Sequence, residues 1–310
     1  MKIKKGYATA PAPLSSIFSP KLFKNDEKRD RIEEIGARGG GFTIRRGVET
    51  YVEYYPREDR AVEIYVNDVK MNFVTSLKAV EIARKMLGLN GRILIRHKIH
   101  VPIGTGFGTS ASAALTTLLT LFKIGGRGIT LQEACRITHE IEVECKTGLN
   151  SEAGFLSEGL ILVLNEGSPP FVKVNSIPIP HGSAIVAVVA APLDTSNVLS
   201  RLDELRRIED FGDKRLQEIL KEPTPENFLK QAREFAWEAG FVTARVQEMF
   251  EEFEKLPVIG YAQNMIGEAC HALVLPDRVK EVEARLKEVF PSYRIVVSEV
   301  NGLIRSSTLT

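Results

Sequence analysis

The sequence of 310 residues contains little that would tie it to nucleic acid or to a membrane. Its formal net charge is only +1, so no excess of positive charge favours binding to nucleic acid. No apolar run approaches the about 18 residues that a membrane-spanning helix needs. The first residues, Met1 to Gly6, are basic but lack the apolar core of a signal peptide. We therefore expect a cytoplasmic protein that binds neither nucleic acid nor a membrane.

Cysteine is also scarce. Cys135, Cys145 and Cys270 are scattered, with neither the spacing of metal ligands nor the number of a disulfide framework. Five dispersed histidines show no metal-ligand spacing either. A hydrophobic content of 44% and a charged content of 26% are those of an ordinary globular protein.

The most informative segment runs from Pro102 to Leu115, Pro-Ile-Gly-Thr-Gly-Phe-Gly-Thr-Ser-Ala-Ser-Ala-Ala-Leu. Three glycines alternate, hydroxyl residues follow, and an Ala/Leu run predicts a helix; residues 92–101 before them have the alternation of a strand. Glycines let the backbone approach an anion, and a helix N-terminus offers free N–H groups with a partial positive charge. We predict a phosphate-binding loop; the alternative is a tight turn without a ligand.

The spacing is not that of a P-loop, because no Gly-Lys-Ser/Thr follows, nor that of Gly-x-Gly-x-x-Gly with a later acidic residue. It resembles Pro-x-x-x-Gly-Leu-Gly-Ser-Ser-Ala-Ala, the nucleotide-phosphate loop of the GHMP kinases, with Phe107 in place of the usual Leu and Thr109 in place of the first Ser. The resemblance implies that ATP is bound by Pro102, Gly104, Gly106, Phe107, Gly108, Thr109, Ser110 and Ala111.

A carboxylate lies on the apolar face of the next predicted helix. Thr130-Leu-Gln-Glu133 is a capping box, and it opens a helix that runs to about Lys146. At 100° per residue, Glu142 falls within the apolar stripe of that helix. A buried carboxylate needs a cationic partner, and Mg²⁺ is the natural candidate because it takes oxygen ligands. The alternative is a structural ion pair with a basic residue.

In GHMP kinases a Glu in the corresponding place, roughly 30 residues after the loop, holds Mg²⁺ together with a loop serine. The resemblance therefore implies Ser110 and Glu142 as metal ligands and as catalytic residues, with Ser112 as a neighbour able to share the role. Ser110 is also a candidate N-cap, which is compatible with binding a metal. His139, near the edge of the same helix face, is interpreted as a structural histidine, with a place at the site as the alternative.

A narrower resemblance is to the archaeal pantoate kinases. It rests, in chain order, on residues 10–18, 36–41, 139–149, 165–170, 194–199 and 259–273. The last of these resembles a second glycine-bearing loop that closes over substrate and phosphates, the alternative being a turn into an amphipathic helix. The resemblance implies an α+β fold in two parts: a β-rich N-terminal half (residues 1–190) with the phosphate loop and its helix, and an α+β C-terminal half (residues 191–310).

The departures from that pattern fall in the expected acceptor pocket. The resemblance implies an Asp at the position of Ser151, a positively charged residue at the position of Val163, and a Ser at the position of Ala37. The N-terminal segment of pantoate kinases carries a His, which this sequence lacks near Pro13. Glu152 is one position away from the place of the missing Asp. The substrate residues that we expect are Arg38, Gly39, Gly40, Ser151, Glu152 and Gln263. Lys146 is a further cation that could neutralise an acidic acceptor; for Arg38 and Lys146 the alternative is an ordinary surface residue.

We therefore predict an ATP- and Mg²⁺-dependent kinase that phosphorylates a hydroxyl of a small acidic metabolite, by resemblance pantoate in coenzyme A biosynthesis. The missing Asp does not exclude this, because phosphoryl transfer depends mainly on positioning and electrostatic stabilisation. The alternatives are a related kinase with a different acceptor and a nucleotide-binding regulator without turnover. A mevalonate-type decarboxylase is disfavoured, because the family resemblance implies the same Asp in those enzymes and this chain lacks it. The oligomeric state stays open, with a homodimer as one possibility.

Overall fold

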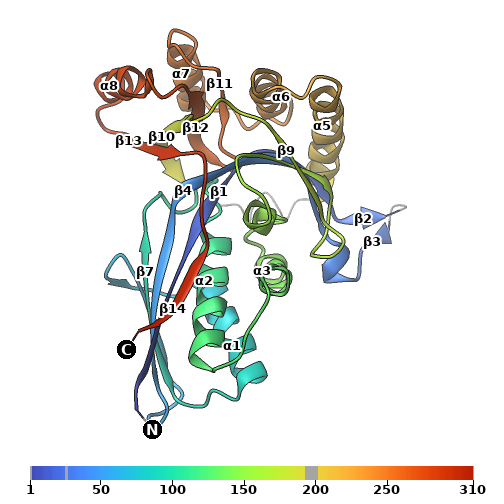
Figure 1. The fold of residues 1–310 in the computed structure, drawn as a ribbon. Helices are drawn as coiled ribbons and strands as arrows, with labels where there is room; N and C mark the ends of the chain where they lie inside the picture. Colours follow the sequence, from blue (N-terminus) through green and yellow to red (C-terminus); the bar gives the residue numbers. More distant parts are fainter. Residues whose placement is uncertain (1, 25–26, 193–201, 310) are drawn as a thin grey trace.

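Two sheets of different size organise the α+β fold that the sequence predicts (Figure 1). The computed structural model describes residues 2–24, 27–192 and 202–309. The larger sheet has the order β14-β1-β4-β7-β5-β6, with β8 on β4 and β9 on β8. Its strands are β1 (Lys4–Lys21), β4 (Gly36–Tyr55), β5 (Val62–Val66), β6 (Val69–Lys70), β7 (Arg92–Ile99), β8 (Leu160–Asn165), β9 (Lys173–Ile177) and β14 (Arg305–Leu309).

Three helices pack together beside the larger sheet: α1 (Val74–Leu87), α2 (Thr109–Ile124) and α3 (Leu131–Cys145) (Figure 1). α2 is buried along nearly its whole length and contacts β1 and β4, while α1 and α3 pack against it. The predicted capping box is present, since the Thr130 side chain accepts from the N–H of Glu133. α1 ends at Gly88 in the left-handed conformation that glycine adopts readily.

The smaller sheet has the order β11-β12-β10-β13 and lies among the C-terminal helices. Its strands are β10 (Ala184–Pro192), β11 (Gly260–Gln263), β12 (Gly267–Val274) and β13 (Arg294–Glu299). The helices are α5 (Leu202–Lys221), α6 (Pro225–Glu238), α7 (Ala244–Phe253) and α8 (Val279–Val289). Short elements complete the described chain: β2 (Phe23–Lys24), β3 (Glu27–Lys28), and the 3-10 helices η1 (Ile32–Glu34) and η2 (Ser151–Phe155).

The two sheets do not divide at residue 190. β10 begins at Ala184 but belongs to the smaller sheet, and β14 returns to pair antiparallel with β1 at the edge of the larger sheet (Figure 1). The helical segment that begins at residue 225 consists of two helices, α6 and α7, separated by a turn at Gly240. Residues 194–199, which contribute to the resemblance, lie outside the described residues.

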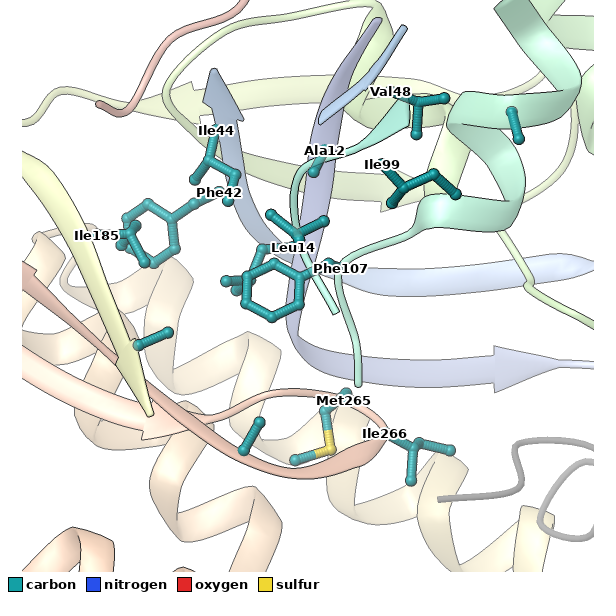
Figure 2. Close-up of a cluster of buried hydrophobic side chains, with 14 of the residues drawn as sticks. Ala12, Leu14, Phe42, Ile44, Val48, Ile99, Phe107, Ile185, Met265 and Ile266 are labelled. Atoms are coloured by element: carbon teal, nitrogen blue, oxygen red, sulfur yellow. The ribbon is translucent and has the colours of Figure 1, made fainter. Parts of the chain in front are cut away.

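One hydrophobic cluster joins the two parts (Figure 2). Phe107 of the predicted phosphate loop is 1% exposed and lies in the same cluster as Leu14 of β1, Met265 and Ile266, together with Ile185 of β10. The large side chain between the loop glycines therefore faces inward and anchors the loop. No helix within the described ranges is long and apolar enough to span a lipid bilayer.

Candidate active site

The three loop glycines line a pocket that is formed together with residues of β1 and β4, and all three have positive φ angles. Gly104, Gly106 and Gly108 have φ values of 74°, 77° and 56°, in the left-handed region that favours glycine. Their neighbours are close: a Cβ on Gly106 would lie 2.8 Å from Asn264 Cβ, and one on Gly108 would lie 2.5 Å from Pro13 Cγ. Glycine is therefore required here both by backbone conformation and by packing.

The backbone carbonyls of this loop are held against the protein. The Asn264 amide donates to the carbonyl of Thr105 at 2.9 Å, and the Ser15 N–H donates to the carbonyl of Gly106 at 3.0 Å. In a trans peptide the C=O and the N–H point in opposite directions. These two contacts therefore turn the N–H groups of Gly106 and Phe107 away from Asn264 and Ser15.

The N–H groups of residues 106–111 have no hydrogen-bond partner within the described chain. They include the first turn of α2, which carries the partial positive charge of a helix N-terminus. Successive free N–H groups at such a point form a concave anion site. Such an arrangement is suited to a phosphate, the ligand that the glycine pattern predicts.

The remaining loop residues occupy different places. Thr109 and Ser110 line the pocket, whereas Pro102, Ala111 and Ser112 do not. The Ser112 hydroxyl is fully buried and donates to the carbonyls of Pro11 and Gly108. We therefore leave Ser112 out of the proposed metal site and assign it to holding the loop on β1. Ser110 is not the N-cap, because the helix begins at Thr109 after Gly108.

Glu142 lies directly behind the pocket wall. Its side chain is completely buried, and Thr147 donates to its Oε1 atom at 2.9 Å. Its Oε2 atom has no hydrogen-bond partner, and it makes no ion pair with any described residue. Burial raises the pKa of the Glu142 carboxyl; the nearby Ser110, Thr147 and Ser151 hydroxyls oppose the rise, and the Glu152 carboxylate adds to it.

These features fit a Mg²⁺ site. An unpaired oxygen on a fully buried carboxylate is a costly feature unless a cation reaches it, and the Ser110 hydroxyl beside it opens onto the pocket. No cluster of three or more His, Cys, Asp or Glu side chains suited to a metal occurs in the described ranges. A serine, one carboxylate and substrate phosphates would form a donor set of the kind that Mg²⁺ uses.

Glu152 does not reach the pocket, contrary to expectation. Its side chain is completely buried, and its Oε1 atom is 2.8 Å from His139 Nδ1. The other ring nitrogen of His139 contacts the carbonyl of Ile35 at 2.8 Å. Burial alone would lower the pKa of His139, but Glu152 and the carbonyls of Ile35 and Ile32 raise it overall. His139 is thus a satisfied structural histidine that holds Glu152 away from the pocket.

The three departures from the pantoate-kinase pattern meet in the pocket. Ala37, Ser151 and Val163 all line it, together with Gly39 and Gly40. The strand pairing explains this, since Gly39 of β4 lies opposite Val163 of β8. The walls near them are apolar and include Ile17, Phe18, Leu149, Ile161, Met265 and Ile266.

A charged group closes this end of the pocket. Arg38 lines the pocket and donates from Nε to Glu166 at 2.7 Å, while Arg29 donates to the other Glu166 oxygen at 2.6 Å. Burial alone would raise the pKa of Glu166, but the two arginines hold it below its usual value. One carboxylate between two guanidinium groups leaves a net positive charge beside the pocket residue Arg38.

Two other expected substrate residues lie elsewhere. Gln263 is completely buried and donates to the carbonyls of Phe241 and Gly267, so it supports the loop that follows β11 and does not line the pocket. Lys146 is exposed at the end of α3 and does not line the pocket either.

Sequence reasoning missed several residues that shape the site. Asn150 accepts from the N–H of Ala37 at 2.7 Å and donates to Gly167, so it ties β4 to the segment after β8. Asn264 and Glu166 were also unassigned, although both lie within the resembling segments. For Asn150 the sequence does carry a signal: Asn adopts positive φ more often than most residues, so an Asn after Thr-Gly-Leu indicates a turn, and its φ is 136° here.

Comparisons with known proteins agree with this geometry. Residues 72–155 match the GHMP kinases N terminal domain. A pantoate kinase of Thermococcus kodakarensis is 27% identical over 292 residues, covering 93% of this chain and 94% of that protein. A solved structure described as "Phosphotransferase related to CoA biosynthesis pathway" has a TM-score of 0.84 at 24% identity, with 98% of each chain covered. Another, "MDDEF in complex with MVAPP, AMPPCP and Magnesium", has a TM-score of 0.73 at 12% identity, with 99% of this chain and 100% of that chain covered.

Residues 72–155 thus match the N-terminal domain of the GHMP kinases, as the loop motif predicted, and the enzyme class is that of a small-molecule kinase. The chain is similar to a pantoate kinase over most of its length. The expected fold and enzyme class are thereby confirmed.

Proposed function

We propose that this protein is an ATP- and Mg²⁺-dependent kinase that phosphorylates a hydroxyl group of a small hydroxy acid, with pantoate as the first acceptor to test. One observation carries the proposal: the unpaired N–H groups of residues 106–111 adjoin a buried carboxylate, Glu142, that has an unpaired oxygen. The first feature suits the phosphates of ATP, and the second suits the cation that accompanies them.

The residues divide the work by position. The loop N–H groups would hold the phosphates, and Ser110 with Glu142 would hold Mg²⁺, which neutralises charge on the phosphates when it is bound. Arg38 would bind the acceptor carboxylate, because it lines the pocket and Glu166 fixes its guanidinium. The acceptor hydroxyl oxygen then forms a bond to the γ-phosphorus as the bond to ADP breaks, and its proton leaves late to water or a phosphate oxygen.

A different acceptor is the second candidate, favoured by Ala37, Val163 and Ser151. These residues replace a hydroxyl, a cation and a carboxylate expected by resemblance, and all three line one pocket. The result is an acceptor region with a more apolar wall and one fixed cation, Arg38. It suits a hydroxy acid with a larger apolar body and fewer polar groups than the family pattern implies.

An ADP-release assay tests the proposal. The purified chain is given ATP and Mg²⁺ with pantoate and a panel of hydroxy acids of increasing apolar size. Acceptor-dependent ADP release supports a kinase, and the acceptor with the highest kcat/KM identifies the substrate class. ATP binding without release by any acceptor would instead favour a nucleotide-binding regulator. A cytoplasmic location and a homodimer remain expectations.

A further inference from the structure

His271 of β12 is fully buried and has a polar partner at each ring nitrogen. Its Nε2 atom lies 2.9 Å from the Ser16 hydroxyl, and its Nδ1 atom lies 2.9 Å from Asn264 Oδ1. Asn264 in turn donates from its amide nitrogen to the Thr105 carbonyl at 2.9 Å. A continuous chain of buried hydrogen bonds thus runs from β1, through the smaller sheet, to the phosphate loop.

The direction of each hydrogen bond in this chain is fixed by chemistry. The Thr105 carbonyl can only accept, so the Asn264 amide donates to it and its Oδ1 atom must accept from His271. His271 therefore carries its proton on Nδ1, and its Nε2 atom accepts from Ser16. Burial lowers the pKa of His271 to about 3, so the ring is neutral at pH 7.

An irregularity in β1 brings Ser16 to the ring. Ser15 pairs with Gly41 and Ile17 pairs with Gly40, so Ser16 is the extra residue of a β-bulge. The neighbouring Ser15 donates to the Gly106 carbonyl, and its own carbonyl accepts from Met265. The bulge thus binds both loops by its backbone and binds His271 by its side chain.

We propose that His271 is a positioning residue for the phosphate loop: by donating to Asn264, it keeps the Asn264 amide on the Thr105 carbonyl and the opposite N–H group, that of Gly106, toward the nucleotide. The inference rests on the proposed function, because it assumes that the loop binds ATP phosphates. His271 lies on the smaller sheet and does not itself line the pocket.

Two substitutions distinguish the role of the Nδ1 atom of His271 from that of its Nε2 atom. His271→Asn places an amide nitrogen near the Nδ1 position and keeps the donor to Asn264, whereas His271→Gln places it near Nε2 and keeps only the contact with Ser16. We expect His271→Gln to weaken ATP binding at least about tenfold and His271→Asn to stay within about threefold of wild type, by calorimetry on the full chain with Mg²⁺.

His97 provides a matched control. It is 2% exposed, its two ring nitrogens contact the Thr50 and Ser76 hydroxyls, and it does not line the pocket. His97→Gln should lower the melting temperature as His271→Gln does, yet keep ATP affinity within about twofold. Unchanged ATP affinity in folded His271→Gln would overturn this inference but not the proposed function. An equal loss of ATP affinity in His97→Gln would do the same. A wild-type chain that binds no ATP would overturn the proposed function with it.

The tautomer gives a measurement that does not depend on any variant folding. Ring ¹⁵N chemical shifts of the wild-type protein at pH 7 report which nitrogen of His271 carries the proton. We expect a neutral ring protonated on Nδ1. A ring protonated on Nε2 would leave Asn264 without its donor, and would overturn the inference.

Discussion

The Oε2 atom of Glu142 lies against the backbone of Gly148, so closely that a Cβ at Gly148 would collide with it. The same Cβ would lie 2.8 Å from the Ser151 hydroxyl. Gly148 and Ser151 both line the pocket, so the residues that contact the buried carboxylate also face the pocket. A residue larger than glycine at position 148 would displace the carboxylate.

Replacing Glu142 by Gln should separate metal binding from folding. We expect Mg²⁺-dependent ATP binding to weaken and turnover to fall about 100-fold or more, the order seen when a stabiliser of transition-state charge is lost. The melting temperature without metal should stay the same or rise, because a buried unpaired carboxylate is removed. Calorimetric titration of ATP with and without Mg²⁺ checks this.

Glu144→Gln is the control for that experiment, since Glu144 lies on the same helix but is exposed and pairs with Lys78. It should leave ATP binding unchanged. Wild-type Mg²⁺ dependence in Glu142→Gln would contradict the metal-ligand assignment.

Gly106→Ala should damage both the fold and ATP binding. The new Cβ would meet Asn264 Cβ at 2.8 Å and the Met265 carbonyl at 2.9 Å, in a backbone conformation with φ of 77°. Gly126 is a matched control, because its φ is 73° but no atom lies within 4 Å of its Cβ position. Gly126→Ala should cost only the left-handed strain of about 1–2 kcal/mol. If denaturant unfolding showed equal losses of unfolding free energy in Gly106→Ala and Gly126→Ala, the loop would not be closely packed at Gly106.

Pantoate phosphorylation by this chain should be weak compared with a family member that has the Asp, the cation and the Ser. The three replacements line one pocket, and groups that act as a unit are strongly non-additive, so Ser151→Asp alone should recover little. Steady-state kinetics with pantoate checks this. A kcat within about tenfold of the ordinary kinase range of roughly 1–100 s⁻¹ would contradict it.

The buried His97 should make stability fall as the pH is lowered. Burial lowers its pKa from 6.5 to about 3, so between these values the unfolded chain binds a proton that the native chain does not. The stability that the neutral ring contributes is therefore fully present above pH 6.5 and is lost as the pH falls toward 3. The difference in unfolding free energy between wild type and His97→Gln should shrink from pH 7 to pH 5, by up to about 1.4 kcal/mol per pH unit below 6.5. A constant difference across that range would show that His97 titrates normally.

The conformation of the glycine loop and the α3 helix were predictable from sequence because local chemistry determines both. The alternating glycines permit the positive φ angles that the loop adopts, and the Thr130 capping box starts its helix by a local hydrogen bond. The burial of Glu142 was predictable for the same reason, since helical periodicity places it on the apolar face.

The long-range contacts were not predictable in this way. Glu152 contacts His139 because the turn at Asn150 directs the first residues of η2 into the interior, where Asn150 also donates to the Glu152 carboxylate. That Gln263 faces inward depends on β11 pairing with β12. Likewise, β14 joins β1 across almost the full length of the chain, and no local pattern records that pairing.

The hydrophobic cluster that contains both Phe107 and Met265 constrains how ligands enter. A hinge rotation that separated the two sheets would pull these side chains apart and expose apolar surface to water, at roughly 25 cal/mol for each Å². The glycine loop and the loop after β11 are therefore packed against each other in the absence of a ligand. Admission of ATP calls for small side-chain and loop displacements around a rigid frame, so binding should be fast and should change the overall dimensions of the protein very little.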